Sequence, residues 1–252
     1  MIEVQSINKY YGSSQVLKNV NLILSDQGVT ALIGPNGAGK STLLGIMSRL
    51  QVADSGRVTI DDLDVHQADN AILAKKMAIL RQDNSMSLRL KVYDFVAFGR
   101  FPYSQGRLTK EDLGHIEKAL NYLNLQDLKD RYLDELSGGQ RQRACIAMVL
   151  CQDTKYLLLD EPLNNLDMKH AVDIMKLIRR AADELGKQVV VVLHDINFAS
   201  CYADRIIAMK EGAVIYDCPP EELMTVDIMR DLYDIEMSIH KIQDRPIGFY
   251  HL

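Results

Sequence analysis

The feature that most constrains this 252-residue chain is a glycine-rich octapeptide between a short apolar run and a helical pattern. Residues 34–41 read Gly-Pro-Asn-Gly-Ala-Gly-Lys-Ser and fit G-x-x-x-x-G-K-[ST] at every position; residues 29–33 form the apolar run and residues 42–50 the helical pattern. Such glycines let backbone N–H groups surround phosphate oxygens, and the helix start adds partial positive charge. We therefore predict a nucleoside triphosphate site, in which Lys40 reaches the β- and γ-phosphates and Ser41 ligates Mg²⁺.

A pair of carboxylates follows a second apolar run. Residues 156–161 read Tyr-Leu-Leu-Leu-Asp-Glu. A carboxylate at the end of a buried strand can hold Mg²⁺ through water, and we assign this role to Asp160. Glu161 then stands at the strand edge where α/β sheets place their ligands, so it can orient the attacking water or accept its proton. The sequence lacks an Asn-Lys-x-Asp element for reading guanine, which argues against a GTPase.

The remaining pattern predicts an α/β domain with a mainly parallel sheet. Residues 29–33, 156–159 and 189–193 are short, apolar and β-branched or leucine-rich, as strands covered on both faces are. Helical stripes at residues 116–123 and 174–185 alternate with them.

Other stretches predict the additions to this core. The first 30 residues and residues 56–65 favour an antiparallel sheet. Residues from about 85 to 150 have mostly helical pattern and suggest an inserted helical subdomain within one domain over 1–252. A hairpin at residues 206–216 and two short helices after Pro219-Pro220 are expected to follow.

Composition excludes several function classes. There are 29 Lys+Arg against 34 Asp+Glu, and the basic runs are only pairs, so we expect no nucleic-acid partner. No apolar run reaches 18 residues, and the first residues lack the pattern of a secretory signal. The four cysteines have no C-x-x-C spacing, which favours reduced thiols in a cytosolic protein.

Residues 136–143, Leu-Ser-Gly-Gly-Gln-Arg-Gln-Arg, resemble the signature of ATP-binding-cassette (ABC) ATPases, and the other motifs of that family occur in order along the chain. The resemblance implies a P-loop NTPase (RecA-like) fold: a parallel-sheet core with an antiparallel β subdomain and an inserted α-helical subdomain. It implies ATP and Mg²⁺ as cofactors. The nucleotide-binding residues of one chain would be Tyr11, Gly34, Pro35, Asn36, Gly37, Ala38, Gly39, Lys40, Ser41 and Thr42.

The resemblance also implies roles for single residues. Tyr11 would stack on adenine, although Tyr10 could do so instead and Tyr11 could be a buried strand aromatic. Gln82 would touch Mg²⁺ and the lytic water, and His194 would act as a switch near the γ-phosphate. Asp167 lies in the loop that links two active sites. Mg²⁺ would thus be held by Ser41, Gln82 and Asp160, and the catalytic set would be Glu161, His194 and Gln82.

By the same resemblance, the chain works as a head-to-tail homodimer. The signature residues would face the nucleotide bound by the other subunit; these are Ser137, Gly138, Gly139 and Gln140. The helical start at the signature supplies a second anion-binding helix terminus, which explains why this position suits a phosphate.

Residues 99–103, Gly-Arg-Phe-Pro-Tyr, and residues 108–112 are similar to those of ATPases of iron(III)–siderophore importers, most closely the catecholate type. This implies membrane permease subunits, indirectly a substrate-binding protein, and a peripheral place on the cytoplasmic side of the cell membrane. The permease groove would use Met86, Leu88, Leu90, Phe101 and Tyr103, which could instead pack inside the helical subdomain. An importer ATPase for haem or cobalamin, or a cytosolic ATPase of iron–sulfur assembly, is the alternative.

Overall fold

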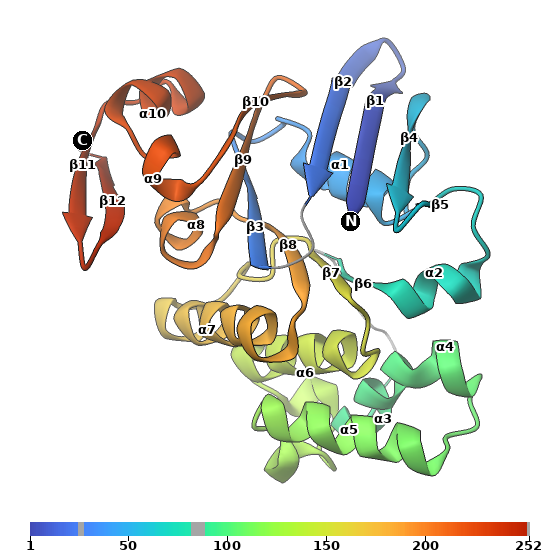
Figure 1. Cartoon of the computed structure of the whole chain (residues 1–252). Coiled ribbons are helices and arrows are strands. Elements are labelled where there is room, and N and C mark those ends of the chain that lie inside the picture. The colour runs from blue at the N-terminus through green and yellow to red at the C-terminus, as the bar shows by residue number, and fades with distance from the viewer. Residues whose placement is uncertain (25–27, 82–88, 251–252) are drawn as a thin grey trace. The chain divides into compact units, whose positions relative to one another are not determined.

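The computed structural model describes residues 1–24, 28–81 and 89–250. The chain divides into two compact units, which we call unit 1 (Met1–Ala68 and Ile178–Leu252) and unit 2 (Asp69–Leu177). Figure 1 follows the elements along the chain.

Unit 1 contains the predicted antiparallel sheet. Its four strands lie in the order β2 (Ser14–Leu24), β1 (Ile2–Tyr11), β4 (Ser55–Ile60) and β5 (Leu63–Asp64). Ile2 is opposite Leu24 on one side and Ile60 on the other, and all three are fully buried. The expected antiparallel sheet is confirmed for residues 2–24, 55–60 and 63–64, whereas residues 28–30 belong to the parallel strand β3 instead.

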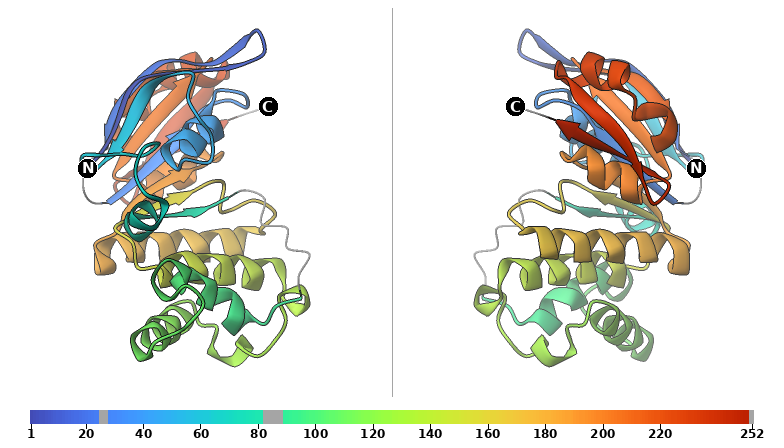
Figure 2. Two further views of the ribbon diagram at one scale, coloured as in Figure 1. Left: turned by 90° about the vertical axis from the view of Figure 1, so that its right-hand side faces the viewer. Right: turned by 90° about the vertical axis from the view of Figure 1, so that its left-hand side faces the viewer.

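Unit 1 also contains parallel strands. β3 (Gly28–Ile33) pairs in parallel with β8 (Gln188–Val192) and with β9 (Arg205–Lys210). β10 (Ala213–Cys218) pairs antiparallel with β9, which confirms the predicted hairpin. Strand β2 contacts β10, so the blue antiparallel sheet and the orange strands form adjacent layers, as both views of Figure 2 show.

The helices of unit 1 are short. α1 (Lys40–Met47) starts two residues before the predicted 42–50, directly after Gly39. It also ends earlier than predicted, because Arg49 turns the chain away from the helix with a φ of 62°. α8 (Ile196–Tyr202) follows β8, and α9 (Pro220–Leu223) and α10 (Val226–Tyr233) are the two short helices expected after the proline pair.

A C-terminal hairpin of β11 (Met237–Ile242) and β12 (Arg245–Tyr250) was not predicted. It is fastened to α8 by side chains: Asn197 exchanges hydrogen bonds with the backbone of Gly248 at 3.1 and 2.8 Å, and the Ser200 hydroxyl donates to the Pro246 carbonyl at 2.5 Å. The available signal was the polar turn Gln243-Asp244 between two alternating runs; both turn residues have positive φ.

Unit 2 pairs strands β6 (Met77–Leu80) and β7 (Tyr156–Leu159) in parallel. Helices α3 (Val92–Ala97), α5 (Lys110–Tyr122) and α6 (Gly138–Cys151) pack on one another. The other elements of the unit are α2 (Asn70–Lys76), α4 (Phe101–Ser104) and the 3₁₀ turns η1 (Phe98–Arg100), η2 (Gln126–Leu128) and η3 (Leu133–Glu135).

Helix α7 (Met168–Leu185) begins in unit 2 and ends in unit 1. Its predicted stripe is buried at Ile174, Leu177, Ile178 and Ala181, whereas Leu185 is 45% exposed. Gly186 follows with a φ of 61°, the left-handed conformation that commonly ends a helix.

All four cysteines are free. Burial raises the pKa of Cys145 to about 11 and that of Cys151 to about 12, so both thiols stay protonated near neutral pH. Among the helices of the described residues, none combines the length and apolar character needed to cross a membrane.

Candidate nucleotide-binding site

The glycine-rich loop joins β3 to α1 in unit 1. Gly34, Gly37 and Gly39 have φ values of 140°, 79° and 97°, which L side chains rarely adopt. A Cβ on Gly34 would collide with the carbonyl oxygen of Met209 on β9, and one on Gly39 would lie 2.9 Å from the Val16 carbonyl. Positive φ and close backbone packing together explain the need for glycine at positions 34 and 39, and positive φ alone explains it at position 37.

Lys40 is the first residue of α1 and is only 5% exposed. Its ammonium donates to the carbonyl oxygens of Gly34 and Pro35 at 2.8 and 2.9 Å. The cation is therefore held directly over the loop. The N-cap residue Gly39 offers no side chain to the helix start. Oriented N–H groups and a nearby ammonium form an arrangement that suits phosphate oxygens.

The strand register brings His194 to the same end of the sheet as this loop. Leu32 is opposite Val192 in the parallel pair, and the Leu193 N–H donates to the Leu32 carbonyl at 3.1 Å. His194 follows directly and is exposed. Asp195 then caps α8, accepting from the N–H of Asn197 at 2.7 Å. Residues about 160 positions apart in sequence thus meet at the carboxyl ends of neighbouring strands, where α/β proteins bind ligands.

A cavity of about 140 Å³ lies beside His194, under the C-terminal hairpin; its lining residues are His194, Asp195, Ile196, Tyr233, Ile235, Met237 and Tyr250. The Tyr233 hydroxyl is buried here and has no hydrogen-bond partner among the described residues. Burial raises the pKa of Tyr233, and the nearby Gly34 backbone partly opposes that rise. Sequence reasoning missed this tyrosine, which approaches the phosphate loop from a distant helix.

Tyr11 ends strand β1 and is 51% exposed, so it is not a buried strand aromatic. Its hydroxyl donates to the Gln51 side chain at 2.7 Å, and the Lys9 ammonium lies 5.5 Å from the ring centre. Tyr10 is 44% exposed, so exposure does not separate the two aromatic candidates.

The two predicted carboxylate residues of unit 2, Asp160 and Glu161, directly follow strand β7, as predicted from the sequence. The Asp160 N–H donates to the Leu80 carbonyl at 2.9 Å, directly after β7. Glu161 has a φ of 48°, and its carboxylate accepts a short hydrogen bond from the Asn164 amide. Positive φ at a non-glycine residue is uncommon and here places Glu161 in a tight turn directly after β7. Gln142 on α6 holds this turn through the Pro162 carbonyl at 2.7 Å.

Ser137 is the N-cap of α6. Its hydroxyl accepts from the Gln140 N–H at 3.3 Å, and the Gln140 side chain accepts from the Ser137 N–H at 3.0 Å. This capping box fixes the helix start two residues before the predicted position near Gln140. The signature is therefore a well-formed N-terminus of a 14-residue helix.

The signature lies against the loop that carries Asp167. An added Cβ on Gly139 would collide with the His170 ring, so only glycine permits this approach. His170 contacts Asp167 twice: its N–H donates at 2.9 Å, and its Nδ1 lies 2.8 Å from the carboxylate. The His170 backbone bond holds the pKa of Asp167 below its usual range. Residues 161–170 are also similar to the siderophore-importer ATPases, but sequence reasoning assigned His170 no role of its own.

The predicted permease-groove residues and Gln82 have different outcomes. Gln82, Met86 and Leu88 lie outside the described residues. Phe101 and Tyr103 are 59% and 37% exposed. Leu90 is half-buried.

A glycine-rich loop between a buried parallel strand and a helix, with carboxylates after another strand, defines a P-loop nucleotide-binding protein. The sequence matches the ABC transporter family over residues 17–164. It is 54% identical over 250 residues to the petrobactin import ATP-binding protein YclP of Bacillus subtilis, covering 99% of both chains. It is 47% identical over 250 residues to FatE of Bacillus anthracis, also named a petrobactin import ATP-binding protein, covering 99% of this chain and 100% of that one.

Among solved structures, an ATP-binding cassette in a dimeric post-hydrolysis state with ADP and phosphate matches with a TM-score of 0.76 and 32% identity, over 87% of this chain and 98% of that one. The chain belongs to the ABC transporter family, as an ATP-binding ATPase subunit. ATPases of ABC importers work with membrane permease subunits and dimerise. The resemblance found in the sequence is confirmed.

Proposed function

We propose that this chain is the ATP-hydrolysing subunit of a ferric siderophore importer, with ferric petrobactin as the first candidate. The observation that supports this proposal most directly is the 54% sequence identity, over the full length, to a protein named for petrobactin import. Because the substrate would not touch this chain, importers of this kind would differ in substrate only through their permease. In this proposal the whole chain, 1–252, is one nucleotide-binding domain with a helical subdomain at about 85–150.

We propose that the loop 34–41 holds the ATP phosphates, with Thr42 next to it in α1. Lys40 supports this role because its ammonium is already fixed at the loop by two carbonyl oxygens. Tyr11 would stack on adenine; its 51% exposure leaves a ring face for that purpose. Base–aromatic stacking contributes about 1–3 kcal/mol and tolerates different bases, so discrimination among purines should be small.

We propose that Glu161 orients and deprotonates the attacking water, with Gln82 and His194 beside the γ-phosphate. The hydroxyl of Ser41 and the carboxylate of Asp160 are oxygen donors of the kind Mg²⁺ prefers, so they fit that ion, with Gln82 as a further ligand. When bound, Mg²⁺ would neutralise charge on the phosphates. His194 would meet the terminal phosphate, and its place at the strand end next to the loop supports this.

We propose a homodimer in which Ser137, Gly138, Gly139 and Gln140 face the partner's nucleotide. The capped, regular start of α6 supports this role because it presents backbone N–H groups and a positive dipole end. Asp167 would contact the partner's site from the adjacent loop. Closure on ATP and release after hydrolysis would then drive the permease.

We propose that a cytoplasmic helix of the permease docks on an aromatic turn, defined as Phe98, Phe101 and Tyr103. These side chains are 47%, 59% and 37% exposed within six residues. Apolar side chains exposed together often mark an interaction surface. The chain would accordingly be peripheral, on the cytoplasmic side of the cell membrane, and would act with a substrate-binding protein outside.

Uptake of radiolabelled iron tests the proposal. A deletion strain without a redundant ATPase receives ferric petrobactin and catecholate, hydroxamate and citrate chelates, and is complemented with wild type or Glu161→Gln. We expect loss of uptake of one chelate class, restored only by wild type. Unchanged uptake across the panel would refute the siderophore function and favour haem, cobalamin or a non-transport role.

A further inference from the structure

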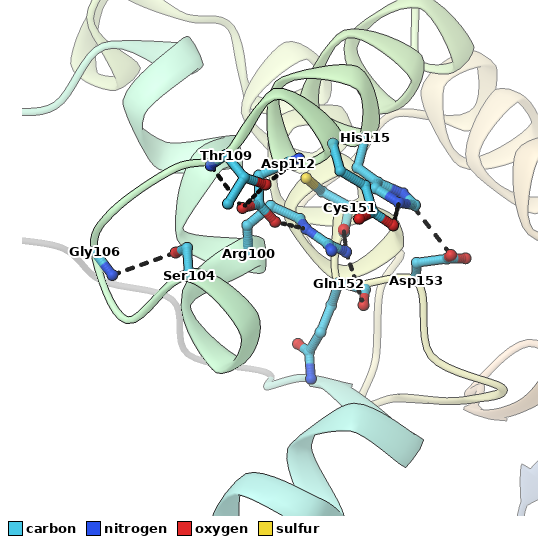
Figure 3. Close-up of polar contacts among 10 residues, drawn as sticks. Arg100, Ser104, Gly106, Thr109, Asp112, His115, Cys151, Gln152 and Asp153 are labelled. Carbon is cyan, nitrogen blue, oxygen red and sulfur yellow. Dashed lines mark hydrogen bonds and ion pairs between the residues drawn. The ribbon is translucent and has the colours of Figure 1, made fainter.

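Arg100 is a buried cation at the base of the aromatic turn. It is the last residue of η1 and is 3% exposed, although Phe98 and Phe101 of the same turn are 47% and 59% exposed. Removing a guanidinium from water is costly unless charge and hydrogen bonds compensate. Figure 3 shows its hydrogen bonds to Asp112, Cys151 and Gln152, all within unit 2.

The first contact is with the start of α5. The Arg100 Nε donates to Asp112 at 2.9 Å, and the Asp112 side chain is only 4% exposed. The other Asp112 oxygen accepts from the Thr109 N–H at 2.9 Å and from the Thr109 hydroxyl at 2.7 Å. Asp112 thus serves as both counter-ion and helix cap, which fixes its carboxylate in place.

The second contact is with the end of α6. An Arg100 N–H donates to the Cys151 carbonyl at 3.1 Å and to the Gln152 carbonyl at 3.5 Å. A cation at a helix C-terminus also interacts favourably with the helix dipole. Gly99 tightens this junction, because an added Cβ would collide with the Met148 carbonyl. The turn therefore lies directly on the last turn of α6.

The third contact is with the aromatic turn itself. The guanidinium lies 4.0 Å from the ring centre of Tyr103, and the Lys75 ammonium of α2 lies 5.3 Å from the same ring. Gln152 completes the cluster by donating to the carbonyls of Ala74 at 2.5 Å and Met77 at 3.0 Å. One guanidinium therefore joins the exposed turn to the end of the helix whose other end is the signature.

We propose that Arg100 is a positioning residue that makes the aromatic turn and helix α6 move as one body. This inference rests on the proposed docking of a permease helix at that turn. Movement of the docked helix would then shift the signature at Ser137, and closure at the signature would move the permease. Lysine could keep the ion pair but cannot donate to Asp112, reach two carbonyls and stack on Tyr103 together.

The test uses the complete transporter, co-purified with its permease through a tag on this chain and reconstituted with its binding protein in proteoliposomes. The variants are Arg100→Lys and the control Arg107→Lys, which changes an exposed arginine a few residues away. The measurements are permease recovered per ATPase, KM for ATP, and ferric siderophore transported per ATP hydrolysed. We expect Arg100→Lys to assemble with unchanged KM but to lower transport per ATP by roughly 2- to 30-fold, with the control like wild type.

Equal falls in transport and hydrolysis, or an equal effect in Arg107→Lys, would overturn the inference. If Arg100→Lys does not assemble, Tyr103→Leu leaves the ion pair intact and should also lower transport per ATP; an unchanged ratio there would overturn the inference as well. A wild-type transporter that carries no ferric siderophore would refute the proposed function and the inference with it. If the wild-type transporter carries ferric siderophore and the variants transport as much per ATP hydrolysed as wild type does, the inference is refuted but the proposed function is not.

Discussion

Asp112→Asn should destabilise unit 2 strongly and change its acid stability. The substitution keeps the shape of the side chain but removes the charge that faces Arg100 at 2.9 Å. The carboxylate uses one oxygen for Arg100 and the other for Thr109, so an amide, with one acceptor oxygen, cannot serve both. Arg100 would remain buried without a counter-ion, keeping only the carbonyl contacts to Cys151 and Gln152 and the ring contact with Tyr103.

Breaking a buried ion pair by removing one partner costs about 3–5 kcal/mol. The pKa of Asp112 gives a second measure of how much its charge contributes to the free energy of unfolding. Hydrogen bonds from Thr109 and from Arg100 lower the pKa of Asp112 from 3.8 to about 2. Because the pKa of Asp112 is lower in the folded than in the unfolded chain, the ionised carboxylate stabilises the folded chain at pH values above the unfolded-state pKa. That stabilisation is lost as the pH falls toward 2. The lowering corresponds to about 2 kcal/mol at neutral pH, of which about 1 kcal/mol is lost by pH 3.

The assay is urea unfolding followed by far-ultraviolet circular dichroism, since the chain has no tryptophan. The control is Asp130→Asn, whose ion pair with Lys91 is 3.8 Å long and 80% exposed on the aspartate side. The control should lose less than about 1 kcal/mol. Between pH 5 and pH 3, wild type should lose about 1 kcal/mol more stability than Asp112→Asn. A loss below about 1 kcal/mol at pH 7, or identical pH dependence of the two proteins, would refute the reasoning.

Four further substitutions test the site. Glu161→Gln should retain ATP binding and lower turnover by about 10²–10⁴; near-normal hydrolysis would remove the assigned role. Ser137→Arg should spare nucleotide binding by the isolated chain but block ATP-dependent dimerisation, so dimers in sedimentation would contradict the head-to-tail arrangement. Gly34→Ala, at a φ of 140° and against the Met209 carbonyl, should cost at least about 1–3 kcal/mol in denaturant unfolding and weaken ATP binding; unchanged affinity would be unexpected. Tyr233→Phe removes a buried hydroxyl that has no hydrogen-bond partner among the described residues, so the free energy of unfolding should stay unchanged or rise by up to about 1 kcal/mol. A lower melting temperature would show that the hydroxyl makes a stabilising hydrogen bond.

Local chemistry made much of this protein predictable. The loop 34–41 needs glycine wherever its φ is positive, and lysine and serine follow at fixed spacing. The motif can therefore be recognised without knowledge of its tertiary contacts. The strands 29–33, 156–159 and 189–193 are apolar on both faces because both faces are covered, and all three were found within one residue. The hairpin at residues 206–216 was equally visible, since Glu211-Gly212 supplies two positive φ values.

Features that depend on tertiary contacts between segments far apart in the sequence were not predictable. The C-terminal hairpin is held by Asn197 and Ser200, which lie 51 and 46 residues from their partners. Nothing in the sequence pairs Arg100 with the end of α6, or sets Tyr233 beside the phosphate loop. Periodicity reports which side of an element faces the core, and a motif reports backbone chemistry within a few residues. A side chain's partners 40 or more residues away are set by how the elements pack, and only the tertiary structure decided those.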